Sequence, residues 1–487
     1  MAERTEQSEM ARTAEVEAQA GPSVQAGPSM RVGSADVVAG STRSPILGRT
    51  GAPLELLAPA GGPEQLEYAI RFGADAVYLA TGRFGMRKRA ANFTPDDLPR
   101  AVAYAHERGV AVHVACNVVM KDSDLADLAS YLELVDRSGA DALIVADLGA
   151  MRLARRHAPH LSLHVSTQAS VANAEAALAW RELGASRIVC AREMSVAQIA
   201  AMRAAVPDDL ELEAFVHGSM CMAYSGRCLV SDFLNGRSAN EGNCTQPCRW
   251  AWELREPSRP GQVFGVEEDG EATYLFNSRD LNMIEHLGDL AAAGVDSVKL
   301  EGRGRKAFYT ATVVGAYRRA IDGEPAADVA PELLKVSHRP YSTGFYYGPA
   351  SQAPASDSSD SDWIWVAEVT DARPADRGDV EGPGRWEAEV VARNRFDCES
   401  ELEVLSPGRP TRRLRISDLQ WVCEGDEAED EAAGDDGELA GESEGPAAVP
   451  PFVAPAEPVA CANRQMERYR FLSDIPLEPH DIVRAHV

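Results

Sequence analysis

The sequence predicts an α/β fold, a (β/α)8 TIM-like barrel, followed by a small C-terminal antiparallel β domain. Short apolar runs alternate eight times with amphipathic helical segments over about 270 residues, which is the pattern of such a barrel. Several of the helical segments end in Gly, the residue that most often follows a helix C-terminus. Beyond residue 362, apolar and polar residues alternate with period two, which predicts the β domain.

The predicted barrel strands are short and apolar. In chain order they cover residues 54–58, 75–80, 110–116, 141–147, 161–166, 186–190, 210–215 and 296–302. Segments such as PEQLEYAIRFG and DLADLASYLELVDRSG supply the helices between them. An open doubly wound sheet is the competing architecture, but APAGGPEQ after the first strand is not the GxGxxG phosphate fingerprint expected there. We therefore expect the barrel.

Composition divides the chain into four segments. Residues 1–50 are rich in Ala, Gly, Ser, Pro and Glu and are predicted to be a disordered tail. The barrel is expected over 51–330, and residues 331–362 carry SHRPYSTGFYYG and a Ser/Asp-rich linker. The β domain is expected over 363–487, with IVRAHV as its last strand, and an acidic, Pro-rich disordered insertion interrupts it at 424–459.

Charge and hydropathy limit the partners. The net charge is −27, but residues 424–444 hold eleven carboxylates and no basic residue, which leaves −16 for the rest of the chain. The overall charge therefore does not exclude an RNA partner, since a local basic patch decides that. The sequence has no long apolar run of membrane-spanning length, so we expect no membrane partner. The first thirty residues lack the apolar core of a secretory signal, so a cytoplasmic location is expected.

Four of the nine cysteines fall close together and are predicted to form one metal site. They are Cys221, Cys228, Cys244 and Cys248, in the pattern Cys-x6-Cys-x15-Cys-x3-Cys. Disulfides are rare in cytoplasmic proteins, and structural zinc usually uses Cys-x2-4-Cys pairs. Thiolate ligation with wider spacing favours a four-iron, four-sulfur cluster, with zinc as the alternative. Because the cysteine loop, residues 217–250, follows the seventh strand, it belongs to the face where barrel enzymes have their active sites.

Strand ends on the same face offer further polar side chains: Asn117, Asp147, Ser166, Thr167, Gln168, Glu193, His217 and Glu301. Each of them alone is as often a helix cap or a packed hydrogen-bond partner. Glu193 and His217 follow strands six and seven, beside the cysteine loop, so we predict them as a catalytic pair that moves protons. His217 has a second interpretation, as a hydrogen-bond donor to a cluster sulfur.

Basic residues follow strands two and eight, and we predict that they bind substrate. They are Arg83, Arg87, Lys88, Arg89 and Arg303. Such a rim would bind RNA phosphates or the carboxylates of a small acid. The neighbouring Phe84 and Phe93 are predicted to stack on a base. The alternative is a solvated face whose charges only end helices.

Motifs spread over about residues 54–350 resemble the collagenase-like peptidase family of unknown catalytic type. They include FVHGSMCMAYSGRC, GNCTQPCRW, STQASVAN, AREMS and VKLEGRGRKAFYTATVVGAYRRAID. The resemblance implies that the four clustered cysteines bind a 4Fe-4S cluster. The N-terminal tail and the acidic insertion have no counterpart in the family pattern.

The likeness is strongest to the branch of the family that hydroxylates wobble uridine of tRNA at C5, giving 5-hydroxyuridine. It implies a tRNA substrate and prephenate, a small dicarboxylate, as co-substrate. Sister branches hydroxylate ribosomal RNA cytidine or quinone precursors, and the family name keeps a peptidase as an alternative. The sequence has no GxSxG elbow and no HExxH motif to support a peptidase. A binding module whose cysteine loop is held by zinc is the third alternative.

Overall fold

A computed structural model describes residues 44–88, 90–221, 223–224, 228–250, 254–255, 263–264, 279–350, 361–375, 386–423, 452 and 454–487. The first 43 residues of the predicted tail, most of the linker and most of the acidic insertion lie outside the described residues. Of the described helices, none is long and apolar enough to cross a membrane.

Eight parallel strands close into a barrel, so the predicted (β/α)8 fold is confirmed. They are β1 Glu55–Pro59, β2 Ala76–Leu79, β3 Ala111–Cys116, β4 Ala142–Val145, β5 Ser162–Val165, β6 Arg187–Val189, β7 Glu211–Ser219 and β11 Ser297–Leu300. Each strand pairs in parallel with its neighbours, and β11 pairs with both β1 and β7, which closes the ring. Two short strands extend this sheet, since β10 (Asp280–Asn282) pairs with β7 and β12 (Tyr341–Ser342) pairs with β10.

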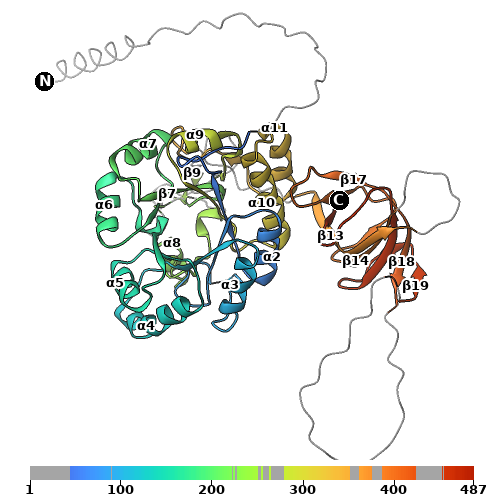
Figure 1. The fold of residues 1–487 in the computed structure, drawn as a ribbon, viewed down its shortest axis with the longest axis horizontal. Coiled ribbons are helices and arrows are strands. Elements are labelled where there is room, and N and C mark those ends of the chain that lie inside the picture. The colour runs from blue at the N-terminus through green and yellow to red at the C-terminus, as the bar shows by residue number, and fades with distance from the viewer. Residues whose placement is uncertain are drawn as a thin grey trace, which may run out of the picture. The chain divides into compact units, whose positions relative to one another are not determined.

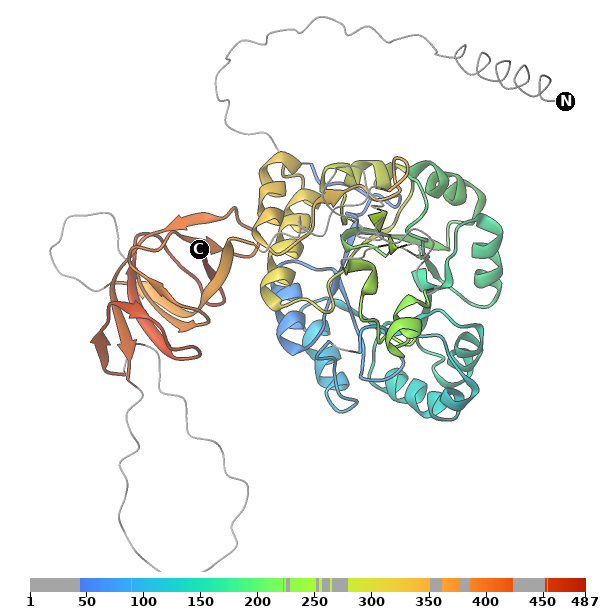
Figure 2. The ribbon, with the colours of Figure 1, turned by 180° about the vertical axis from the view of Figure 1, so that it is seen from behind.

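Helices surround the ring of strands in both views of the molecule (Figures 1 and 2). They are α2 Pro63–Arg71, α3 Leu98–His106, α4 Asp122–Arg137, α5 Leu148–His157, α6 Ala174–Glu182, α7 Val196–Ala205, α9 Leu287–Ala292 and α10 Ala307–Ile321. Local sequence fixes several starts: Asp147, Asn173 and Ser195 cap α5, α6 and α7 by accepting a backbone N–H bond. Asp147, one of the strand-end candidates, therefore has a structural role.

Shorter elements connect the barrel units. They are the helices α8 Val230–Asn235 and α11 Ala326–Val329, the 3-10 turns η1 Thr167–Ala169, η2 Pro247–Arg249, η3 Ile284–His286 and η4 Ala330–Lys335, and the paired strands β8 Leu254–Arg255 and β9 Val263–Phe264. Of these, α8 and η2 belong to the cysteine loop.

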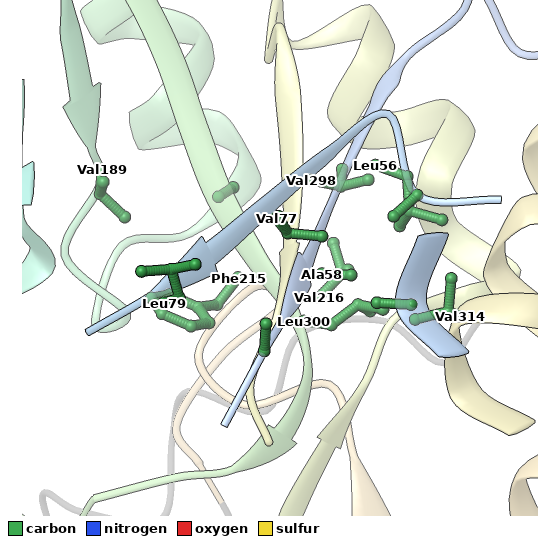
Figure 3. Close-up of a cluster of buried hydrophobic side chains, with 14 of the residues drawn as sticks. Leu56, Ala58, Val77, Leu79, Val189, Phe215, Val216, Val298, Leu300 and Val314 are labelled. Carbon is green, nitrogen blue, oxygen red and sulfur yellow. The ribbon is translucent and has the colours of Figure 1, made fainter. Parts of the chain in front are cut away.

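Alternate residues of each barrel strand face opposite sides. Leu56, Val298 and Leu300 belong to the large core between strands and helices, and Figure 3 shows them with Val314 of α10. Their neighbour Leu57 belongs instead to a second, smaller cluster with residues of β2 and β4. The period of two thus divides each strand between the helix layer and the barrel interior, where the polar side chains described below are found.

The N-terminal boundary of the barrel differs from the prediction. The Ile46 N–H donates to the Ile321 carbonyl at 2.7 Å, and Arg49 forms an ion pair with Asp296 at 3.1 Å. Residues 44–50, which composition assigned to the tail, therefore contribute to the barrel.

The C-terminal domain is an eight-stranded antiparallel sheet, as predicted. Its order is β17-β16-β22-β13-β14-β21-β18-β19, and the last strand of the chain lies inside the sheet. The strands are β13 Trp363–Pro374, β14 Trp386–Ala392, β16 Leu402–Leu405, β17 Arg412–Leu414, β18 Ile416–Val422, β19 Ala456–Pro458, β21 Arg468–Ser473 and β22 Ile482–His486, with β15 Phe396–Asp397 and β20 Cys461–Ala462 as a separate pair. Because β19 pairs with β18, the acidic insertion ends before residue 456 rather than at 459.

Candidate active site at the mouth of the barrel

The carboxyl ends of the barrel strands surround a small, partly open cavity of about 60 Å³. Its floor is formed by Tyr78, Ile144 and Phe215, which project from β2, β4 and β7. Five strand-end residues that the sequence predicted on this face line it: Asn117, Ser166, Thr167, Gln168 and Glu301. Its cationic wall consists of Arg87, Arg192, Lys299 and Arg303. Parallel strands bring these residues together because all their carboxyl ends meet at one face of the barrel.

Arg87 and Glu301 form the central ion pair of the site. The Arg87 guanidinium donates to Glu301 Oε1 from Nη2 at 2.9 Å and from Nε at 3.2 Å. Burial alone would raise the pKa of the Glu301 carboxyl, but the charges of Arg87 and Arg192 outweigh it and lower the pKa to about 2. Glu301 is therefore ionised at neutral pH, where it orients Arg87 and does not donate a proton.

A second cavity lies on the other side of this ion pair. Arg87 and Glu301 line it together with Ser219, Cys244 and Arg305. The ion pair is thus the boundary that the barrel cavity shares with the cysteine loop.

Gly242 allows the cysteine loop to approach the Arg87 segment. Its φ is +80°, and a Cβ there would lie 3.2 Å or closer to backbone atoms of Gly85, Met86 and Arg87. The Gly242 carbonyl also accepts a hydrogen bond from the Lys88 N–H at 3.2 Å. A larger residue at 242 would push the loop away from the ion pair.

The cysteine loop carries four thiols, of which Cys244 lines the second cavity. Cys221 is exposed, and Cys228, Cys244 and Cys248 are half-buried. The charge of Glu301, and to a smaller extent Cys221, raises the pKa of the Arg87 guanidinium, which places Cys221 near Arg87. The Gln246 N–H donates to Cys244 Sγ at 3.2 Å.

The four sulfurs do not form a preformed zinc site among the described residues. No three of these four described sulfurs lie within 4.8 Å of one another. One tetrahedral zinc ion, with Zn–S bonds of about 2.3 Å, would bring all four within about 4 Å. A four-iron cluster binds each thiolate to a different iron and so holds the sulfurs farther apart. Backbone N–H donors to ligand sulfurs, such as that of Gln246, also stabilise a cluster.

Two guanidiniums in the barrel cavity lack a full set of partners. Arg303 is only 4% exposed, yet it forms no hydrogen bond or ion pair with any described residue, and burial lowers its pKa to about 10. Arg192 donates from Nη1 to the Ser219 carbonyl at 2.9 Å and stacks over the Phe215 ring at 3.9 Å, but its Nε has no partner among the described residues. A buried guanidinium whose N–H donors lack partners is costly unless a ligand accepts from them.

A polar layer lies deeper in the barrel, below the cavity floor. His113, His164 and Glu213 are buried, and one potential ligand atom of each lies within 4.8 Å of the others. Both Glu213 oxygens already accept from cations, from Lys299 at 2.7 Å and from Arg187 at 3.2 Å. A metal ion would have to compete with these two positive charges, so the geometry fits a structural ion network better than a metal site.

His217 lies in an aromatic environment away from both cavities. It is buried beside Tyr309, Tyr317 and Tyr341, and burial lowers its pKa to about 3, so the imidazole is neutral. Glu193 is half-buried. Neither residue is among the described residues that line the two cavities. The proton-transferring Glu193–His217 pair stays a prediction.

The predicted basic rim divides into two groups. Arg87 and Arg303 reach the barrel cavity, whereas Arg83 is exposed in an ion pair with Asp127 at 2.8 Å and Lys88 is exposed. Arg89 lies outside the described residues.

The aromatic neighbours of this rim are placed differently from the prediction. Phe84 and Phe93 are 5% and 3% exposed and belong to the barrel core, so the prediction that they stack on a base is wrong.

Sequence reasoning missed two residues of the cavity. Arg192 is the third residue after β6, and a basic residue just after a barrel strand was the signal that identified Arg303. Lys299 stands inside an otherwise apolar strand, and a lone charge in a parallel strand indicates a residue that faces the barrel interior.

The fold and the site define a (β/α)8 barrel protein with a cationic mouth beside a cysteine loop. Residues 61–355 match peptidase family U32, and the chain belongs to this family. The resemblance to the collagenase-like peptidases is thereby confirmed.

Relatives in this family have different named activities. The chain is 33% identical over 405 residues to tRNA hydroxylation protein P of Escherichia coli (strain K12), which covers 72% of this chain and 86% of that protein. It is 36% identical to the 23S rRNA 5-hydroxycytidine C2501 synthase of the same organism, over 57% of this chain and 41% of that protein. It is 32% identical to a collagenase of Porphyromonas gingivalis (strain ATCC BAA-308 / W83), over 60% and 73% of the two chains.

Proposed function

We propose that this protein is an RNA hydroxylase that converts wobble uridine of tRNA into 5-hydroxyuridine in the cytoplasm. The observation that carries the proposal is the similarity to tRNA hydroxylation protein P, which extends over 86% of that relative. The cationic cavity beside the cysteine loop supports it, because RNA and small acids are both anionic.

The surface of the cysteine loop suits an unpaired RNA segment. Tyr224, Phe233 and Trp250 are 54%, 90% and 42% exposed, which is unusual for large aromatic side chains. Single-stranded RNA is recognised largely by stacking of splayed bases on such rings. The exposed Arg83 and Lys88 on the neighbouring segment would contact phosphates. We propose these three aromatic residues for base stacking, in place of Phe84 and Phe93.

Inside the cavity, Gln168 is suited to read a uracil edge. Its Oε1 atom is buried without a hydrogen-bond partner among the described residues. It would accept a hydrogen bond from uracil N3–H, which cytosine lacks. The C5–C6 double bond of uracil is conjugated to a carbonyl, so addition of an oxygen substituent at C5 is chemically reasonable.

Prephenate is proposed as the co-substrate because the cavity has unpaired cations. Arg303 and Arg192 would bind its carboxylates through charge-assisted hydrogen bonds. Arg87 is held by Glu301 at the boundary with the cysteine loop and would orient the acid there.

Cys221, Cys228, Cys244 and Cys248 are proposed to hold a 4Fe-4S cluster. Such a cluster, when bound, would supply one-electron chemistry. The chain's own contribution is positional: Gly242 and the Lys88 N–H fix the loop beside Arg87, and the Gln246 N–H supports Cys244. Anaerobically purified protein should be brown and contain four irons per chain; a colourless preparation containing zinc would contradict this assignment.

A gene deletion with nucleoside analysis of tRNA tests the main proposal. The deletion strain should lose 5-hydroxyuridine and its derivatives, and the wild-type gene should restore them. Cys221→Ser should fail to restore them, whereas Cys423→Ser, a half-buried cysteine of the β domain, is the matched control that should succeed. An unchanged tRNA profile would refute the proposal. Loss of hydroxycytidine from ribosomal RNA, or gelatin cleavage by the purified protein, would instead favour the activities of the other relatives.

A further inference from the structure

Lys299 is a buried amine on the wall of the barrel cavity. It is 3% exposed, and its Nζ lies 4.5 Å from the centre of the Tyr78 ring and 5.5 Å from that of Phe215. Glu213, which is fully buried, accepts a hydrogen bond from Nζ at 2.7 Å. A buried amine with aromatic neighbours and a carboxylate partner has the surroundings of a nucleophilic lysine.

The surroundings of Lys299 favour its neutral amine form more strongly than bulk water would. Burial lowers the pKa of Lys299, and the charges of Arg187 and Arg192 lower it further, against the opposing effect of Glu213. Because Glu213 is in direct contact, it can take the proton that the ammonium releases.

The same cavity offers a place for a carboxylate next to this amine. Arg192 and Lys299 approach the same Phe215 ring, at 3.9 and 5.5 Å from its centre. The buried Arg303 guanidinium, which also lines the cavity, has no partner among the described residues. One small ligand can therefore place a carboxylate on a guanidinium and an adjacent carbon atom near Nζ.

We propose that Lys299 forms an imine with the ketone of a small 2-oxo acid bound in the barrel cavity. The ammonium first transfers one proton to Glu213, and the neutral amine attacks the ketone carbon. A second N–H proton moves to the carbonyl oxygen, which gives a carbinolamine. Protonated Glu213 then returns its proton to the hydroxyl, which leaves as water while the nitrogen lone pair forms the C=N bond. The products are one protonated imine and one water, with no net oxidation or reduction.

This inference rests on the proposed function only for the identity of the natural acid, since prephenate carries a 2-oxo acid group. The imine itself requires neither RNA nor the four clustered cysteines. It would fix the acid in the cavity and withdraw electrons from the carbon next to the imine, as lysine imines do in other enzymes.

Borohydride trapping on the full-length protein tests the proposal. Pyruvate and phenylpyruvate, each added with borohydride, should give one reduced adduct per chain by intact mass spectrometry. Peptide mapping should place it on Lys299. Lactate, which has the carboxylate but no ketone, should give no adduct. No adduct with either 2-oxo acid, or an adduct spread over exposed lysines, would overturn the proposal without any variant having to fold.

Variants sharpen the result. Lys299→Met should abolish the adduct, whereas Lys306→Met, which removes an exposed lysine after the same strand, should keep it. Arg303→Met should raise the pyruvate concentration needed for half-labelling by roughly 10- to 100-fold, because a charge-assisted hydrogen bond to the carboxylate is lost. An adduct that survives Lys299→Met would refute the assignment.

The outcome is separable from that of the proposed function. Cys221→Ser should label fully with pyruvate while it fails to restore 5-hydroxyuridine in tRNA. Labelling at Lys299 in a protein whose deletion leaves tRNA unchanged would refute the tRNA proposal and leave the imine standing. The reverse pattern would refute the imine alone.

Discussion

Two buried arginines of the barrel differ in their partners. Arg187, in the layer below the cavity, and Arg303, in the cavity wall, are 5% and 4% exposed. Arg187 donates to Glu55 at 2.6 Å, to Glu211 at 2.8 Å and to Glu213 at 3.2 Å. Arg303 has no partner among the described residues. Burial lowers the pKa of both, but the three carboxylates more than reverse this for Arg187, whereas the pKa of Arg303 stays low, at about 10.

The difference separates a structural charge from a binding charge. A buried ion pair repays part of its desolvation within the fold, whereas a buried cation without a partner is a cost that only a ligand can offset. Arg187 is therefore balanced by carboxylates within the fold, whereas the Nε and Nη2 atoms of Arg303 have no partner among the described residues.

The largest loss of stability is expected when Arg187 is removed from its carboxylate partners. Arg187→Met leaves Glu55 without its arginine partner and Glu213 with Lys299 alone, so the free energy of unfolding should fall by about 3–5 kcal/mol. Urea unfolding followed by circular dichroism measures this. Arg181→Met is the matched control, since it removes an exposed arginine paired with Asp209, and it should leave the unfolding midpoint unchanged. Equal effects of the two variants would contradict the assigned role of Arg187.

The Arg87–Glu301 pair of the cavity wall should make the free energy of unfolding depend on pH through the Glu301 carboxyl. Its folded pKa of about 2 lies below the ordinary value of 4.5, so its stabilisation is present above about pH 4.5 and is lost as the pH falls toward 2. The difference in unfolding free energy between wild type and Glu301→Gln should be about 3 kcal/mol near pH 6 and shrink in acid. His113, whose pKa is lowered to about 4 by burial, destabilises both proteins below pH 6.5 and cancels in the difference. If the difference in unfolding free energy between the two proteins stays constant from pH 6 to pH 3, Arg87 does not stabilise the ionised form of Glu301.

The sequence predicted the upper layer better than the lower one. Apolar strands with polar residues directly after them identify the mouth of a parallel barrel, so Asn117, Gln168, Glu301 and Arg303 could be placed from their position after a strand. The lower layer could not be predicted, because Arg187 of β6 meets Glu55 of β1 only when β11 closes the ring between β7 and β1. Such contacts depend on register, which periodicity does not give.

The direction in which loop side chains point was the other property that the sequence could not predict. Phe84 and Arg83 are neighbours, yet one is buried in the core and the other is exposed. Phe84 has a φ of +63°, a conformation that a bulky residue adopts only in a constrained turn, and no sequence pattern indicated it. The aromatic residues exposed on the cysteine loop were missed for the same reason.

Replacing Arg303 should weaken the binding of a small carboxylate without lowering the stability of the fold. Arg303→Met should leave the unfolding free energy unchanged or raise it, because the variant no longer buries an unpaired cation. Binding of a small carboxylate should weaken by about 1.5–3 kcal/mol, which calorimetric titration with phenylpyruvate measures. Arg203→Met, at a half-buried arginine outside the cavity that donates to three backbone carbonyls, is the control that should lose stability but retain binding. A destabilised Arg303→Met would mean that the fold does contain a counter-charge for it.

The smallest effect is expected at Arg83, which is exposed and paired. Its side chain and that of Asp127 are each 60% exposed, and such ion pairs contribute about 0.2–1 kcal/mol or less. Arg83→Ala should therefore leave stability and carboxylate binding unchanged. If Arg83 contacts a phosphate, the slope of log affinity for tRNA against log salt should decrease by about one. Filter binding over a range of salt concentrations measures it. Arg83→Ala could instead weaken carboxylate binding as much as Arg303→Met does. Burial without a hydrogen-bond partner would then not be the property that identifies a carboxylate-binding arginine in this barrel.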